Sequence, residues 1–114
     1  MWLTWWKLRM ENIMSYLEEA EELLRKGDTI QASEKYYKAA EEAIKVLAKK
    51  FMLVNVLDEV SKKGRWKSEI LFKAARILDS SLPGILKMWK SAWKLHEDGF
   101  HEGSLDAEIV YVLG

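Results

Sequence analysis

The chain has 114 residues, which is enough for one domain with one hydrophobic core and too few for two. Hydrophobic residues make up 49% and charged residues 32%, which excludes a disordered chain. Basic and acidic residues number 18 each, so no net charge attracts the molecule to nucleic acid or membrane. The absence of cysteine excludes disulfides, thiolate catalysis and cysteine-based zinc sites. It fits the cytoplasmic location that we expect.

No stretch is long and apolar enough to span a bilayer, so we expect no membrane span. The opening residues MWLTWWK lack the basic region and cleavage site of a secretory signal. Glu and Lys are abundant while side-chain amides are scarce, a composition that favours a heat-adapted source.

The first predicted helix covers residues 4–26. Its apolar residues recur at every third or fourth position, which keeps one face of a helix apolar. These residues are Trp6, Met10, Ile13, Leu17, Ala20 and Leu24. Trp2 and Trp5 do not share this face, and exposed indoles usually mark a contact outside the monomer core. We therefore expect a homodimer in which these tryptophans contact the partner subunit, with packing inside the monomer as the alternative.

The second predicted helix, residues 28–51, is expected to be the central helix of the fold. Gly27 ends the first helix, and Asp28 can cap the second by accepting a backbone N–H of its first turn. One row on this helix consists of Ile30, Ser33, Tyr37, Ala40, Ile44, Leu47 and Phe51. A flanking row consists of Ala32, Tyr36, Ala39 and Ala43. Because alanines let other helices approach closely, we expect neighbours on two sides of this helix.

The next segment, residues 52–63, fits either a continued helix or a bent, partly buried loop. A third helix is predicted over residues 68–80, with Ser68 as its cap. Its inner face is expected to carry Ile70, Leu71, Ala74, Ile77 and Leu78. A fourth helix is predicted over residues 84–98, and Gly99 is expected to end it.

A last short helix is predicted over residues 104–113, with Ser104 as its cap. Its β-branched residues also fit a strand, but a lone strand has nothing to pair with in a helical chain. These elements predict an all-α fold. The expected architecture is an up-and-down bundle of four or five helices in a single domain, residues 1–114.

A basic stretch lies between residues 45 and 67. It contains Lys45, Lys49, Lys50, Lys62, Lys63, Arg65 and Lys67, interrupted by Asp58 and Glu59. Such a stretch is usually a solvated surface of mixed sign. It also supports an alternative function, a nucleotide- or RNA-binding module.

The densest polar cluster is KSAWKLHEDGFHEGS, residues 90–104. It contains both histidines of the chain, His96 and His101, each followed by a glutamate, Glu97 and Glu102. The histidines are five positions apart with a glycine between them, whereas a helical zinc motif places them four apart. We therefore expect no metal and no other cofactor here.

A structural role is the simplest interpretation of the two histidines. His96 falls on the same helix face as Trp89, Ala92 and Trp93 and is expected to pack against them. His101 is then expected to hydrogen-bond a helix end.

At these residues the sequence resembles a known group. The strings DTIQASEKYYKAAEEAIKVLAKK, GRWKSEILFKAARILD and MWKSAWKLHEDGFHEG are similar to the HEPN superfamily (higher eukaryote and prokaryote nucleotide-binding). Within it, the chain most resembles the archaeal PaREP group, over roughly residues 18–109. The resemblance implies a HEPN-like bundle of four or five helices that usually dimerises.

Many members of the superfamily are ribonucleases or toxins, with an arginine four to six residues before a histidine. The histidine acts on the ribose 2′-hydroxyl or its phosphate, and the arginine neutralises developing charge. Other members bind nucleotides or act beside a nucleotidyltransferase, so the resemblance implies such partners. In this chain the arginine position before His96 is taken by Lys90, which lacks the two-pronged phosphate grip of arginine.

The sequence therefore favours a small homodimeric binding or interaction module without an established enzymatic activity. The first alternative is a metal-independent ribonuclease in which Lys90 contacts phosphate and His96 is the general acid or base. Glu97, His101 and Glu102 would orient these groups, beside Trp89 and Trp93. The second alternative is the nucleotide- or RNA-binding module at residues 45–67.

Overall fold

The computed structural model describes residues 2–101, and the side-chain surroundings of residues 4–98. All its regular elements are helices, which confirms the predicted all-α bundle. They are α1 (Trp2–Arg25), α2 (Thr29–Lys50), α3 (Val54–Lys63), α4 (Ser68–Ser81), α5 (Ile85–Lys94) and the π-helix η1 (Leu95–His101). The helix predicted over residues 104–113 lies outside the described residues.

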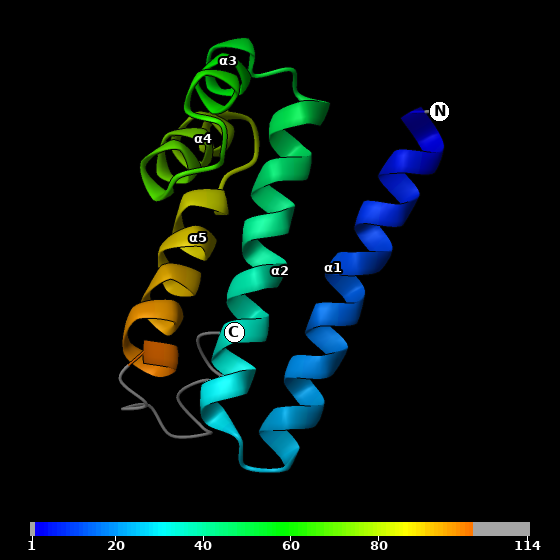
Figure 1. The fold of residues 1–114 in the computed structure, drawn as a ribbon, viewed down its shortest axis with the longest axis vertical. Coiled ribbons are helices and arrows are strands. Elements are labelled where there is room, and N and C mark those ends of the chain that lie inside the picture. Colours follow the sequence, from blue (N-terminus) through cyan, green and yellow to red (C-terminus); the bar gives the residue numbers. More distant parts are fainter. Residues whose placement is uncertain (1, 102–114) are drawn as a thin grey trace.

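Helix α2 is the centre of the arrangement, as predicted. It contacts α1, α3, α4, α5 and η1. In Figure 1, α1 and α2 form an antiparallel hairpin, and α5 runs along the other side of α2. Helices α3 and α4 cross near the end of α2 that is farthest from the hairpin turn. Every other described helix is therefore positioned relative to α2.

The tight turn between α1 and α2 follows from Gly27 and Asp28. Gly27 has a φ of 82°, and the next backbone N–H, that of Asp28, reaches back to the carbonyl of Leu23 at 2.9 Å. The Asp28 carboxylate then accepts the backbone N–H of Gln31 at 3.0 Å, which confirms the predicted cap. This turn reverses the chain within three residues.

The structure resolves the open question of residues 52–63 in favour of a separate helix, α3. Met52 adopts a left-handed conformation with a φ of 51°, which interrupts the helical path after α2. At the next junction, Ser68 is the first residue of α4 rather than its cap, and Lys67 occupies the capping position without a side-chain hydrogen bond.

The prediction that Gly99 ends the fourth helix is wrong. The backbone passes from α5 into the π-helix η1, which continues to His101. A glycine weakens a helix without necessarily ending it. The π-helical turn holds more residues than an α-turn, so it shifts the face that each side chain occupies. Leu95 and His96, at the start of η1, lie against α2.

The main core lies between α2, α4 and α5. Its fully buried large side chains include Ile44, Leu71, Leu78 and Trp89. A smaller cluster of Ala20, Ala32, Tyr36 and Leu95 joins α1, α2 and η1.

Four residues predicted to face inward are instead exposed, by 38–42% of their surface. They are Met10, Ile30, Phe51 and Ile77. Ile30 and Phe51 lie at the two ends of α2, beyond the turns that its neighbours cover. Ile77 lies beside the buried stripe of α4 that ends at Leu78.

The Asp79 carboxylate fixes the start of α5. It accepts backbone N–H groups of Gly84 and Leu86, each at 3.1 Å. We expect Asp79→Ala to lower the free energy of unfolding by about 1 kcal/mol, the usual cost of a lost cap, in urea titration. Ser80→Ala is the matched control, since the exposed Ser80 hydroxyl donates to the carbonyl of Ile77 in its own helix. Equal midpoints for the two variants would contradict the capping role.

Candidate functional site

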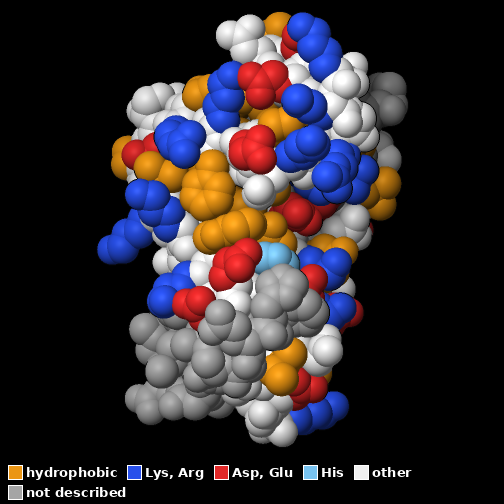
Figure 2. Space-filling view, turned by 60° about the vertical axis from the view of Figure 1, so that its left-hand side comes forward, with side chains coloured by type: hydrophobic (Ala, Val, Ile, Leu, Met, Phe, Trp, Pro, Cys, Tyr) orange, Lys and Arg blue, Asp and Glu red, His pale blue; other side chains and the backbone are white. Residues whose placement is uncertain are grey.

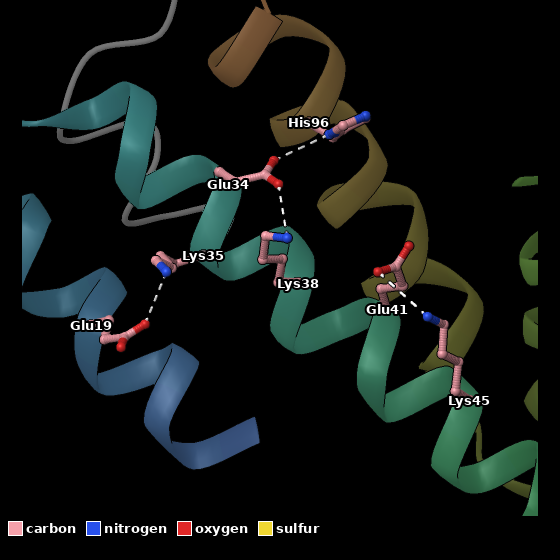
Figure 3. A network of polar contacts seen from close by, with 7 residues as sticks. All are labelled: Glu19, Glu34, Lys35, Lys38, Glu41, Lys45 and His96. Carbon is pink, nitrogen blue, oxygen red and sulfur yellow. Dashed lines mark ion pairs between the residues drawn. The ribbon is translucent and has the colours of Figure 1, made fainter. Parts of the chain in front are cut away.

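The first candidate site surrounds His96 at the start of η1. Its imidazole stacks on the Tyr37 ring, with centroids 4.0 Å apart and planes 19° apart. The Trp93 ring lies 5.6 Å away, which confirms the predicted contact between these two residues. Figure 3 shows the Glu34 carboxylate between His96 and Lys38, with its Oε2 3.5 Å from the His96 Nδ1. The Glu34 and His96 side chains are only 17% and 20% exposed, so this pair is largely screened from water.

Tyr37 is the titratable group whose environment is most altered here. Burial raises the pKa of its hydroxyl far above its ordinary value, and the negative charges of Glu41, Glu34 and Glu97 raise it further. The ring also contacts Trp89 at 5.5 Å, so it links the histidine to the core. Tyr37 therefore stays neutral throughout the physiological range.

This raised pKa predicts a loss of stability at high pH. The unfolded chain releases the Tyr37 proton above about pH 10, whereas the folded chain retains it. The contribution of Tyr37 to the free energy of unfolding is thus complete below about pH 10. Above this pH it declines by at most about 1.4 kcal/mol per pH unit. We expect Tyr37→Phe to lack this decline in urea titrations between pH 8 and 11. Tyr16→Phe keeps Tyr37 and should retain the decline; the same pH profile for both variants would contradict the assignment.

The other residues predicted for this site do not all meet at His96. Trp89 is fully buried in the core, and Trp93 is half-buried beside it. Lys90 is exposed and lines a different hollow, together with Asp79, Lys87 and Lys94. Glu97 is exposed, while the His101 side chain and Glu102 lie outside the part whose side chains are described.

Sequence reasoning missed the two main partners of His96, Tyr37 and Glu34, because they come from α2. Figure 2 shows the face toward α4 and α5, where hydrophobic side chains gather beside histidine and acidic side chains. The aromatic cluster under this face includes Phe72, whose ring lies 5.5 Å from that of Trp93. The histidine is thus mainly part of an aromatic packing layer.

The second candidate site is a hollow between α1, α2 and the segment before α4. We call it the Trp5–Trp66 hollow; its volume is about 220 Å³. It is lined by Trp5, Arg9, Glu42, Lys45, Val46, Lys49 and Trp66. Two indoles that are 61 residues apart in the sequence thus flank lysines of the predicted basic stretch. The signal in the sequence was Trp5, which did not fit the inner face of the first helix.

Cations lie over the indoles at this end of the molecule. The Lys49 Nζ lies 4.9 Å from the centre of the Trp5 ring, and the Lys50 Nζ lies 4.3 Å from that of Trp6. Trp5 and Trp6 are half-buried by these contacts. Trp5 is therefore partly covered by α2, and its contact with a partner subunit stays a prediction. The Trp2 side chain lies outside the described part.

Several cations near the hollow are not neutralised. Arg9 pairs with Glu42 at 3.0 Å, and Lys45 pairs with Glu41 at 3.7 Å. Five others form no ion pair with a carboxylate in the part of the chain that the structure describes: Lys49, Lys50, Lys63, Arg65 and Lys67. This end of the protein therefore carries positive charge although the whole chain is neutral.

A model of the archaeal PaREP1/PaREP8 family matches residues 8–112. The chain belongs to this family. No curated protein matches it. The chain is similar to a Sulfolobus solfataricus protein of known crystal structure, with 55% sequence identity and a TM-score of 0.84. The match covers 90% of this chain and 83% of that protein's chain. A solution structure described as an Orf protein is also 55% identical, with a TM-score of 0.80 and coverage of 90% and 79%.

The PaREP match includes Lys45, Lys49 and Trp66 but begins after Trp5. The described residues of this PaREP protein, 2–101, contain no group of three or more His, Asp or Glu side chains placed to hold a metal ion. None of the helices in the same range has the length and apolar character needed to cross a membrane.

Proposed function

We propose that this PaREP protein binds a nucleotide or a single-stranded RNA at the Trp5–Trp66 hollow. The observation that carries the proposal is the set of unneutralised lysines beside two indoles. Phosphate groups require cations, and bases stack on aromatic faces, so the two features together suit a ligand that has both. The resemblance to the HEPN superfamily supports the same class of ligand.

Each group in the hollow has a distinct expected role. The ammonium group of Lys49, which lines the hollow, contacts phosphate, because no described carboxylate pairs with it. Lys50 follows it on α2, lies over the Trp6 ring and contacts a neighbouring phosphate. Trp66 offers a ring for stacking, since it packs on the core with one side and is only half-buried. Glu42 neutralises Arg9 and so limits the total positive charge of the hollow. Moderate affinity for single-stranded ligands follows from this balance.

A titration over a salt series tests the proposal. A labelled single-stranded RNA is followed by fluorescence anisotropy, and binding should weaken as salt rises. Replacing both Lys49 and Lys50 by Gln should reduce the slope of log K against log salt by roughly 1.4, because each phosphate contact on a single strand contributes about 0.7. Lys87→Gln is the matched control, an exposed lysine on α5 away from the hollow. Undetectable binding, or equal losses in both variants, would refute the proposal.

A ribonuclease remains a second candidate, favoured by the Glu34–His96 pair at 3.5 Å. In that case His96 transfers a proton at the ribose 2′-hydroxyl or its phosphate. Lys90 has different neighbours from His96, so its phosphate contact has weaker support. Incubation of RNA with the protein and EDTA tests the activity, and cleavage that persists in His96→Ala would eliminate this residue.

The homodimer and a nucleotidyltransferase-type partner remain proposals that rest on the HEPN resemblance. Met10 and Met14 are four positions apart on α1 and are 38% and 52% exposed, which supports a protein contact on that face. Sedimentation of the wild type and of a variant lacking residues 1–6 tests the homodimer. A monomeric mass for both would exclude the dimer.

A further inference from the structure

An apolar groove lies between α1 and α5, with α2 as its floor. Its volume is about 290 Å³, and it shares no lining residue with the Trp5–Trp66 hollow. Ile13 and Leu17 form the α1 wall, while Met88 and Ala92 form the α5 wall. The floor is made of Tyr36 and three alanines, Ala39, Ala40 and Ala43. Side chains of this kind leave room for another apolar element.

The alanines explain what shape of element the groove can accept. Small residues let the backbone of a neighbouring helix come close, and bulky apolar side chains on that helix then fill the space. Helices α1, α2 and α5 run side by side in Figure 1. They occupy three of the four helix positions of a four-helix bundle. The groove is therefore the place for a fourth helix.

We propose that residues 104–113 of the same chain fill this groove as a helix. Leu105, Ile109 and Val112 are spaced by four and three, which places them on one face of a helix. Ten helical residues extend about 15 Å, and the α5 wall from Met88 to Leu95 extends about 10 Å. The segment is therefore long enough to cover this wall.

The position of the segment in the chain supports this occupant. Leu95, the first residue of η1, already lines the groove, and η1 ends at His101. Only Glu102 and Gly103 then separate η1 from the segment, and such a short link returns the chain beside the helix that precedes it. The PaREP family match also extends to residue 112, so the segment belongs to the matched unit.

Charge complementarity supports the same arrangement. Asp106 and Glu108 flank the apolar stripe, and residues 102–114 contain no Lys or Arg. Lys87 is next to Met88 of the groove wall, is exposed, and forms no ion pair with any carboxylate among the described residues. An acidic flank of the segment thus faces Lys87 at the edge of the groove.

Paramagnetic broadening in the full chain tests the proposal. The chain has no cysteine, so Ala107→Cys carries a nitroxide at one site, on the face opposite the stripe. The methyl signals of Ile13 and Met88 should broaden, while those of Val54, in α3, should not. A second sample mixes nitroxide-labelled chains with isotope-labelled chains that lack the nitroxide. Broadening of the Ile13 and Met88 signals in this mixture would assign the groove to the segment of a second copy and overturn the proposal, as would no broadening in either sample.

A stability comparison gives an independent readout. Ile109→Asp places a charge on the apolar stripe, so we expect the Tm to fall by roughly 10 °C. When this change is combined with the nitroxide at residue 107, the broadening of the Ile13 signals should disappear. Ala107→Asp places the same charge on the opposite face, and its Tm should change by no more than about 2 °C. Equal Tm values for the two aspartate variants would contradict the docking of this segment.

Discussion

Trp89→Ala is expected to lower the free energy of unfolding by about 3–5 kcal/mol. The Trp89 side chain is 0% exposed, and its ring contacts those of Tyr37 at 5.5 Å and Phe72 at 5.8 Å. Truncation removes the apolar contacts of the indole and leaves a cavity between α2, α4 and α5 that these elements cannot fully close. The loss is a large share of the stability of a domain of this size.

Urea titration of the wild type, Trp89→Ala and Trp89→Phe measures this loss. The indole Nε1 is buried without an acceptor among the described residues. Trp89→Phe keeps an aromatic ring and removes that buried N–H group, so its loss should be clearly smaller than that of Trp89→Ala. Two variants of equal stability would mean that Trp89 is not the centre of the aromatic cluster.

Trp66→Ala is expected to weaken binding of single-stranded RNA by roughly 5- to 150-fold, because stacking of one base on an aromatic ring contributes about 1–3 kcal/mol. Trp66 lines the hollow together with Lys45 and Lys49, so a base on its ring places the adjoining phosphate near these ammonium groups. The proposed site requires both interactions.

Anisotropy titration of three variants isolates the stacking contribution. Trp66→Phe keeps a ring and should lose less affinity than Trp66→Ala. Tyr16→Ala removes a half-buried aromatic ring of α1 that does not line the hollow, and its affinity should equal that of the wild type. Melting curves of all three confirm that the protein is folded at the titration temperature. Full affinity in folded Trp66→Ala would exclude base stacking on this residue.

The α1–α2 hairpin could be predicted from the sequence because its determinants are local. Gly27 and Asp28 end one helix and cap the next through neighbouring backbone groups. The central position of α2 also followed from its own pattern, since two adjacent faces carry small and apolar residues. Periodicity predicts a helix and its buried face when the signal repeats over several turns.

The separate helix α3 and the π-helix η1 could not be predicted in this way. The break after α2 depends on a left-handed Met52, a conformation that a methionine rarely adopts and that no pattern indicates. The extension through Gly99 depends on packing of Leu95 and His96 against α2, which overrides the low helix propensity of glycine.

Both candidate sites depend on contacts between distant residues. His96 was predicted to pack on its own helix, yet its closest ring partner is Tyr37, from α2. Trp5 and Trp66 were separate features of the sequence, and only the folded chain places them around Lys49. Residue types thus indicated the chemistry, while the tertiary fold decided which residues share a site.

The most direct test of the proposed function is an NMR titration that follows the indole N–H signals. The chain has six tryptophans, so each region of interest contributes its own reporter. On addition of single-stranded RNA, we expect the signals of Trp5 and Trp66 to shift, while that of Trp89, in the core, stays in place. Shifts confined to Trp89 and Trp93, or no shift at saturating RNA, would contradict binding at the Trp5–Trp66 hollow.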